Sequence, residues 1–106
     1  MSPKPVIPRA LAVEDVDHAV DHYLSEAGVD VALGFVDALQ AAYRHIAAHP
    51  DTGSPRYALE LELPGLRCWA VSDYPYLLFY LNRDDHIDLW RVLHSARQIP
   101  HHMQRP

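Results

Sequence analysis

The sequence predicts a single α+β domain in which an antiparallel helix hairpin packs on a three- to four-stranded antiparallel sheet. Residues 13–48 carry apolar side chains at helical three- and four-residue spacing, interrupted at Gly28. Residues 66–93 instead hold three short apolar runs separated by tight polar turns, which is typical of an antiparallel meander. Two helices followed by a run of strands favour an α+β architecture. A length of 106 residues suits one domain, spanning 1–106.

The first predicted helix spans about residues 13–27. One face of it is apolar, with Val13, Val16, Val20, Tyr23, Leu24 and Ala27. Gly28 is expected to end this helix. The second predicted helix spans about residues 30–48, with Asp30 as its N-cap. It should end at His49, because proline disfavours the α conformation of the residue before it. The short connection predicts that the two helices fold back on each other.

The strands are predicted from alternation and from runs of apolar residues. Residues 5–11 can supply only an edge strand, because Pro8 has no N–H to donate to a ladder. Residues 58–63 alternate leucine with glutamate, which predicts a short strand or extended chain. Three more strands are expected, at 66–72, 76–82 and 87–93. The middle one is continuously apolar and is therefore expected to be covered on both faces.

Composition excludes several classes of protein. Nine Lys and Arg stand against fourteen Asp and Glu, a net charge of −5, which disfavours a protein that binds nucleic acid electrostatically. Cys68 is the one cysteine, so an intrachain disulfide is impossible. No signal peptide is visible, and the longest apolar run, 74–81, is too short to cross a bilayer. We therefore expect a cytoplasmic domain that does not enter the membrane.

The C-terminal end is the basic part of this acidic chain. Residues 89–106 contain no Asp or Glu but six cationic or titratable groups: Arg91, His94, Arg97, His101, His102 and Arg105. Arg67 begins one predicted strand and could approach Arg91 to Arg97 at one end of the sheet. Arginines beside a histidine could hold a phosphate and transfer a proton, as in a nuclease. The same groups could bind an acidic protein partner, or the arginines could simply pair with surface carboxylates.

Histidine pairs on the predicted helices raise the question of a metal site. His18 and His22 are four residues apart, as are His45 and His49, and this spacing can chelate zinc. Neither pair has a carboxylate or cysteine that would complete a site, so we expect exposed helix surface and no metal. No nucleophile motif or phosphate-binding glycine loop is present. We expect no cofactor.

Three motifs together resemble the RelE/ParE superfamily of toxins from bacterial type II toxin–antitoxin systems. They are Pro64-Gly65-Leu66-Arg67, Tyr74-Pro75-Tyr76-Leu77-Leu78-Phe79-Tyr80, and Arg91-Val92-Leu93-His94-Ser95-Ala96-Arg97-Gln98-Ile99-Pro100. The resemblance covers roughly residues 5–100. The last motif is similar to the ParE branch in particular, in which an Arg-Val-Leu-His-x-x-Arg-x-Ile/Phe ending is typical.

The resemblance implies a toxin that inhibits DNA gyrase and is held inactive by a ParD-like antitoxin, whose disordered tail folds onto it in a hetero-oligomer. The alternative is a RelE-like endoribonuclease that cleaves mRNA on the ribosome. The acidic net charge and Ser95, where some nucleases carry tyrosine or histidine, favour gyrase, and hence a protein that is not an enzyme. The resemblance and the charge pattern together give three sets of site residues. Those expected to bind the target are Arg91, His94, Arg97 and Ile99; those expected to bind the antitoxin are Arg67, Tyr76, Leu78 and Tyr80; and the nuclease alternative would use Arg67, His94 and Arg97.

Overall fold

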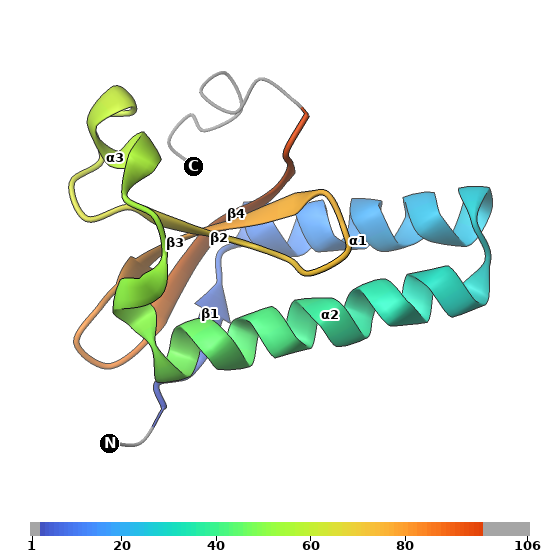
Figure 1. Cartoon of the computed structure of the whole chain (residues 1–106), viewed down its shortest axis with the longest axis horizontal. Helices are drawn as coiled ribbons and strands as arrows, with labels where there is room; N and C mark the ends of the chain where they lie inside the picture. Colours follow the sequence, from blue (N-terminus) through green and yellow to red (C-terminus); the bar gives the residue numbers. More distant parts are fainter. Residues whose placement is uncertain (1–2, 97–106) are drawn as a thin grey trace.

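The computed structural model of the chain describes residues 3–96. Two long helices lie side by side and antiparallel beneath a small sheet (Figure 1). The elements in chain order are β1 (Val6–Pro8), α1 (Ala10–Glu26), α2 (Val29–Ala48), the short 3₁₀ helix η1 (Pro50–Thr52), α3 (Arg56–Glu60), β2 (Arg67–Ala70), β3 (Tyr76–Asn82) and β4 (Ile87–His94). The α+β class and the antiparallel helix hairpin are confirmed.

Gly28 forms the turn between the two long helices. Its φ of 94° lies in the left-handed region that favours glycine, and its N–H donates to the carbonyl oxygen of Tyr23 at 2.9 Å. Gly28 therefore closes α1 as expected. It is also the N-cap of α2, so the prediction of Asp30 as the cap is wrong. Asp30 lies instead in the first turn of α2, where its negative charge complements the helix dipole.

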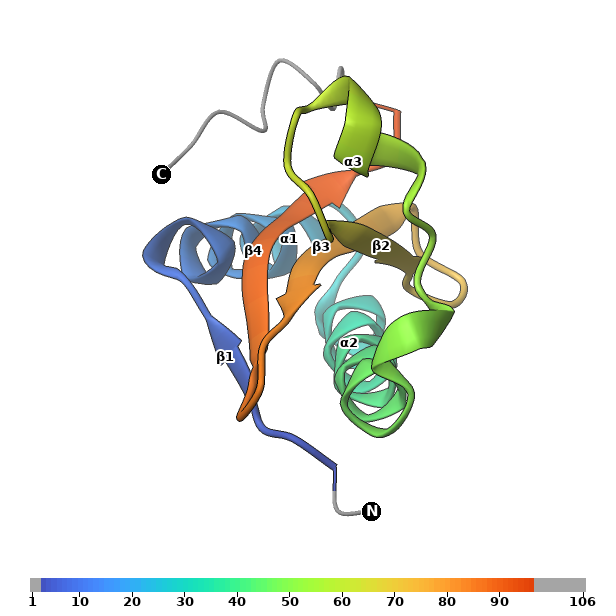
Figure 2. The same cartoon turned by 90° about the vertical axis from the view of Figure 1, so that its left-hand side faces the viewer.

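The sheet has the strand order β1-β4-β3-β2. Strands β2, β3 and β4 form the expected antiparallel meander, and β3 spans the predicted residues 76–82. β1 adds a fourth strand at the edge beside β4, parallel to it, with Val6 opposite Ile87 and Pro8 opposite Leu89 (Figure 2). The sheet is therefore mixed. A parallel pair of strands needs a long connection, and here both long helices and the strands β2 and β3 lie between β1 and β4 in the sequence.

Residues 56–60 form a short helix and a turn follows at Leu61 and Glu62, so the predicted strand or extended chain at 58–63 is wrong. The Ser54 hydroxyl accepts the N–H of Arg56 at 3.2 Å, and the carbonyl of Pro55 accepts the N–H of Ala58 at 3.0 Å, which together start the helical turn. The alternating pattern misleads because Leu59 is 90% exposed. Helix packing, rather than a pleated strand, decides which of these leucines are covered.

The sheet is covered on both faces by two separate apolar clusters. Tyr76, Leu78 and Tyr80 of β3 face the cluster formed with α1 and α2. Phe79 faces a smaller cluster on the other side, which is completed by residues of 57–66 around α3. This two-sided burial confirms the interpretation of 76–82 as a central strand. The same burial fixes the end of β4, where Val92 and Leu93 are buried on opposite faces.

Candidate binding site at the end of strand β4

Asp15 of α1 accepts a backbone hydrogen bond from the second half of β4, where no described strand pairs with that edge. Strand β1 pairs only with residues 87–89, and a bulge follows at Trp90, because Tyr80 lies opposite Leu89 whereas Phe79 lies opposite Arg91. Beyond the bulge, the Oδ2 atom of Asp15 accepts the backbone N–H of Val92 at 3.0 Å. The carboxylate thus satisfies a donor on the sheet edge that β1 leaves unpaired.

The same carboxylate binds Arg91 at two points. Arg91 Nε donates to Oδ2 at 2.7 Å, and Nη2 donates to Oδ1 at 2.8 Å. Both side chains are largely buried, with 15% of Arg91 and 11% of Asp15 exposed. The hydrogen bond from Asp15 raises the pKa of Arg91, which keeps the guanidinium charged. That Arg91 contacts a target stays a prediction; in this fold its side chain holds α1 against β4.

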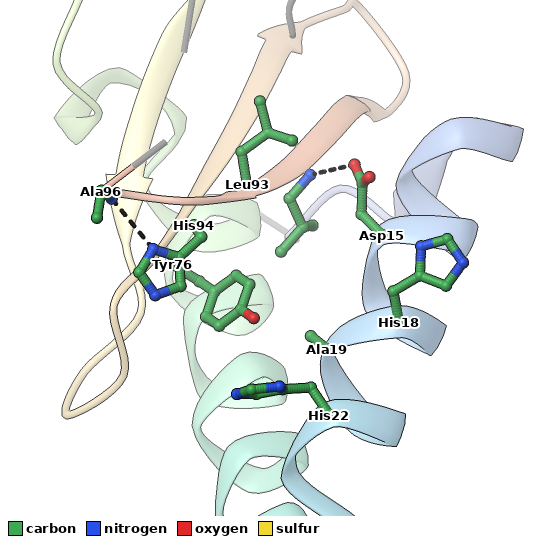
Figure 3. A pocket seen from close by; sticks show the side chains of 9 residues that line it. Asp15, His18, Ala19, His22, Tyr76, Leu93, His94 and Ala96 are labelled. Carbon is green, nitrogen blue, oxygen red and sulfur yellow. Dashed lines mark hydrogen bonds between the residues drawn. The ribbon is translucent and has the colours of Figure 1, made fainter. Parts of the chain in front are cut away.

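A pocket of about 390 Å³ opens beside this ion pair, between α1 and the end of β4 (Figure 3). Its lining comes from α1, β3, β4 and the residues that follow: Asp15, His18, Ala19, His22, Tyr76, Val92, Leu93, His94 and Ala96. His18 and His22 are exposed as predicted, yet they line the same pocket as His94. The pocket lining therefore combines two histidines of α1 with His94, which is far from them in the sequence.

His94 is held in one orientation at this pocket. Its Nδ1 atom accepts the backbone N–H of Ala96 at 3.1 Å, and its ring meets the ring of Tyr76 edge to face at 5.3 Å between centroids. An Nδ1 that accepts a hydrogen bond carries no proton, so in the neutral ring the proton is on Nε2. His94 can therefore donate a hydrogen bond through Nε2.

Arg67 lies at the other end of the sheet from His94. Arg67 lies opposite Tyr80 of β3, and Tyr80 in turn lies opposite Leu89, near the start of β4. His94, at the end of β4, lies opposite Tyr76, the first residue of β3. The two positions are on the order of 15 Å apart along the strands. In a meander the first and third strands run in the same direction, so the start of β2 meets the start of β4. The expectation that Arg67 and His94 share one end of the sheet is wrong.

The Arg67 guanidinium is also already bonded. Its Nη1 donates to the carbonyl oxygens of Gly53 at 2.7 Å and Asp51 at 3.1 Å, which fixes the loop after η1. Arg97 and Ile99, the remaining predicted site residues, lie outside the described residues, as do His101, His102 and Arg105. The described part of the chain therefore does not assemble the nuclease set of Arg67, His94 and Arg97.

Three residues predicted to bind the antitoxin are part of the core. Tyr76 is 7% exposed, and Leu78 and Tyr80 are fully buried. Tyr80 Oη donates to the carbonyl oxygen of Pro50 at 2.7 Å. An apolar central strand predicts burial at least as strongly as it predicts a binding surface, and burial is what the fold shows. The burial of these three side chains favours a role in the core over contact with an antitoxin.

Two further features are absent from the described residues 3–96. No group of three or more His, Cys, Asp or Glu there is arranged to hold a metal ion, and no helix there is long and apolar enough to span a membrane. The residues that sequence reasoning missed are Asp15, His18 and His22 as neighbours of His94. The signal present in the sequence was their spacing of three and four residues, which puts them on one side of α1.

Comparison with known proteins defines the class to which this fold and site belong. Residues 6–99 match the family described as "ParE toxin of type II toxin-antitoxin system, parDE". The chain therefore belongs to the ParE toxin family of type II toxin–antitoxin systems.

A solved structure shows the same fold. It is described as "Chromosomal ParDE TA system from P. aeruginosa", with a TM-score of 0.73 and 20% sequence identity over 88% of this chain and 97% of that chain. At this identity the likeness supports the fold alone. The comparison with curated proteins found no match.

Proposed function

We propose that this ParE-family toxin inhibits DNA gyrase and is neutralised by a cognate ParD-like antitoxin, with which it forms a hetero-oligomer. Membership of the ParE toxin family is the basis for both parts of the proposal. The net charge of −5 supports a protein target over an RNA substrate, because phosphate backbones attract basic surfaces. Gyrase as a target implies action in the cytoplasm.

The observation that carries the choice between gyrase and mRNA is the separation of Arg67 from His94. A ribonuclease needs a cation and a general acid or base around one phosphate. Here Arg67 is at the opposite end of the sheet and donates to the carbonyls of Asp51 and Gly53. Ribosome-dependent mRNA cleavage through Arg67, His94 and Arg97 is therefore the less supported alternative.

In this proposal the gyrase-binding residues are His94, Arg97 and Ile99, at and beyond the end of β4. Arg91 contributes by holding β4 to α1, since its guanidinium is bound to Asp15. His94, the described member of this set, is fixed at the end of the largely buried strand β4. In this proposal the protein acts by binding gyrase and needs no catalytic residue.

Purified chain without antitoxin tests the proposal in two parallel assays. The first is plasmid supercoiling by gyrase, and the second is mRNA cleavage on translating ribosomes. We expect loss of supercoiling with accumulation of cleaved plasmid, reversed by added antitoxin, and intact mRNA. Cleaved mRNA with normal supercoiling would contradict the proposal and favour the nuclease alternative.

A further inference from the structure

We propose that the outer edge of β2 at Ala70, together with a small pocket beside it, binds a short extended segment of the antitoxin as an added strand. This inference rests on the proposed function, because it names one contact of the proposed toxin–antitoxin complex. Figure 2 shows β2 at the edge of the sheet farthest from β1. Ala70 is the last residue of β2 and is exposed.

The backbone N–H and carbonyl of Ala70 point away from the sheet. Two residues earlier, Cys68 exchanges both of its backbone hydrogen bonds with Ser54 on the side away from β3, at 2.8 and 2.9 Å. The N–H of Val71 instead donates inward, to the carbonyl oxygen of Tyr76 at 2.9 Å. Because backbone groups alternate in direction along an antiparallel strand, those of Ala70 point outward like those of Cys68. No hydrogen bond within residues 3–96 uses either group.

The open part of this edge is short. At one end Ser54 covers Cys68, and at the other end the chain turns at Ser72 and Asp73 toward β3. Two β2 strands paired antiparallel about Ala70 would put Ser72 of one copy opposite Cys68 of the other, where Ser54 already lies. The opening therefore favours a short extended segment of another protein over a second copy of this chain.

A pocket of about 220 Å³ lies beside the open edge, on the face of the sheet that packs on α2. Most of its lining is small side chains: Ala38, Ala41, Ala42, His45, Trp69, Ala70 and Ser72. The rings of His45 and Trp69 are stacked with their centroids 4.0 Å apart, and His45 Nε2 also lies 3.0 Å from the hydroxyl of Thr52. These contacts fix one part of the lining before a partner binds.

The side chains of an added strand would reach this pocket. Trp69 and Val71 pack in the cluster between the sheet and the long helices, whereas Cys68 belongs to the cluster on the opposite face. Ala70 therefore also points to the opposite face. In an antiparallel pairing, the residue opposite Ala70 shares its face, so the residues on either side of it point toward α2. Valine, leucine or methionine at those positions would bury apolar surface against the alanines of the pocket.

The position of Ala70 in the sheet favours the antitoxin as the occupant. Ala70 lies opposite Leu77, and Leu77 lies opposite Leu93, the residue before His94. Two strand spacings, on the order of 10 Å, separate Ala70 from Leu93. A segment added at Ala70 is therefore at the same end of the sheet as His94. The antitoxin that carries this segment would lie beside a proposed gyrase-binding residue, as neutralisation requires.

The first test measures the dissociation constant of the complex by calorimetry, with the purified product of the gene beside that of this chain as the antitoxin. The variant is Ala41→Leu, which places a larger side chain in the pocket from an exposed position on α2. The control is Ala48→Leu, the same change at an exposed position at the end of α2, outside the pocket. Thermal melting of each chain checks that all are folded.

The second test measures hydrogen exchange of the Ala70 amide by nuclear magnetic resonance, in the free chain and in the complex. This N–H has no acceptor within residues 3–96, so it should exchange fast in the free chain. An added strand would supply an acceptor, and we expect exchange to slow at least about tenfold in the complex. Sedimentation of the free chain shows whether two copies associate.

We expect Ala41→Leu to weaken antitoxin binding about tenfold, because the added side chain takes the room of the antitoxin residue, while Ala48→Leu behaves like the original chain. An unchanged dissociation constant in Ala41→Leu, or an Ala70 amide that exchanges equally fast in the complex, would overturn the assignment of this edge and leave the proposed function standing.

Two other results would overturn the choice of occupant. Weaker inhibition of gyrase by Ala41→Leu, with antitoxin binding unchanged, would assign the edge to gyrase. Slow exchange at Ala70 in a free chain that sediments as a dimer would assign it to a second copy. No complex between the original chain and the antitoxin would instead contradict the proposed function, and this inference with it.

Discussion

Asp15 and Arg91 join α1 to the bulged half of β4 by a two-point ion pair, and Asp15 also accepts the backbone N–H of Val92. This one carboxylate completes the sheet edge that β1 leaves open, and it fixes the wall of the histidine pocket. The arrangement explains why an arginine in the most basic part of the chain is largely buried. Its first role is to hold the fold together.

Replacing Asp15 by alanine should therefore destabilise the fold. It leaves a largely buried guanidinium and a strand N–H without their partner, which costs about 3 kcal/mol of unfolding free energy. Urea unfolding at pH 7 measures the loss. Asp17→Ala, at an exposed position two residues further along α1, is the matched control and should change stability by no more than about 0.5 kcal/mol. Equal effects of the two substitutions would show that the Arg91 pair adds nothing.

A second ion cluster predicts how stability depends on pH. Asp88 is 6% exposed and accepts hydrogen bonds from Arg9, Arg83 and the indole N–H of Trp90. The hydrogen bond from Arg9, with further help from the Arg9 charge and from Arg83 and Trp90, lowers the pKa of Asp88 despite its burial. Because the pKa is lower in the fold, the ionised carboxylate stabilises the fold above its ordinary pKa of about 3.9, and this contribution is lost as the pH falls below that value.

Asp88→Asn should therefore lower stability at pH 7 and flatten the decline below about pH 4. Urea unfolding at pH 7, 5, 4 and 3 gives the comparison. Asp84→Asn, on an exposed turn residue, serves as the control and should keep the original pH profile. A decline below pH 4 as steep in Asp88→Asn as in the original chain would assign the acid sensitivity to other carboxylates.

Gly53 and Tyr80 should be coupled in stability. A Cβ atom added at Gly53 would run into the hydroxyl of Tyr80, which donates to the carbonyl oxygen of Pro50. Gly53→Ala should destabilise the fold by about 1–3 kcal/mol. The same substitution should cost less in a Tyr80→Phe background, where the hydroxyl is gone, although the ring carbon Cζ at 2.9 Å and Arg67 Cβ at 3.0 Å still crowd the added atom. Additive losses in this double-mutant cycle would show that the contact with the hydroxyl is not the cause.

Much of this fold was predictable because its signals are local. The helical spacing of residues 13–48 predicts both long helices, and the unbroken apolar run at 76–82 predicts the central strand. Gly28 was predictable as a helix end because the left-handed conformation strongly favours glycine. The alternation at 58–63 failed because the partner that covers a leucine is set by tertiary packing.

The candidate site was less predictable because it depends on contacts between distant parts of the chain. The spacing of His18 and His22 is visible in the sequence, but their approach to His94 depends on α1 lying along the edge of β4. The bulge at Trp90 shifts the register in which Arg91 meets its neighbours, and no local pattern marks it. The direction of β2 relative to β4 likewise separates Arg67 from His94.

The C-terminal segment should be dispensable for the fold. A chain that ends at Ala96 keeps β4, the pocket lining and the Asp15–Arg91 pair. We expect its melting temperature to stay within a few degrees of that of the full chain, and its affinity for the antitoxin to be largely retained. Circular dichroism and calorimetry measure both. A chain that fails to fold without residues 97–106 would give that segment a structural role.

The most direct test of the central claim is to count gyrase-dependent breaks in plasmid DNA with the full chain and with the chain that ends at Ala96. The full chain should convert supercoiled plasmid to cleaved product, and added antitoxin should prevent it. The shortened chain, shown to be folded and to bind antitoxin, should leave the plasmid intact. Equal cleavage by both would contradict the assignment of the segment beyond β4, and no cleavage by either would contradict gyrase as the target.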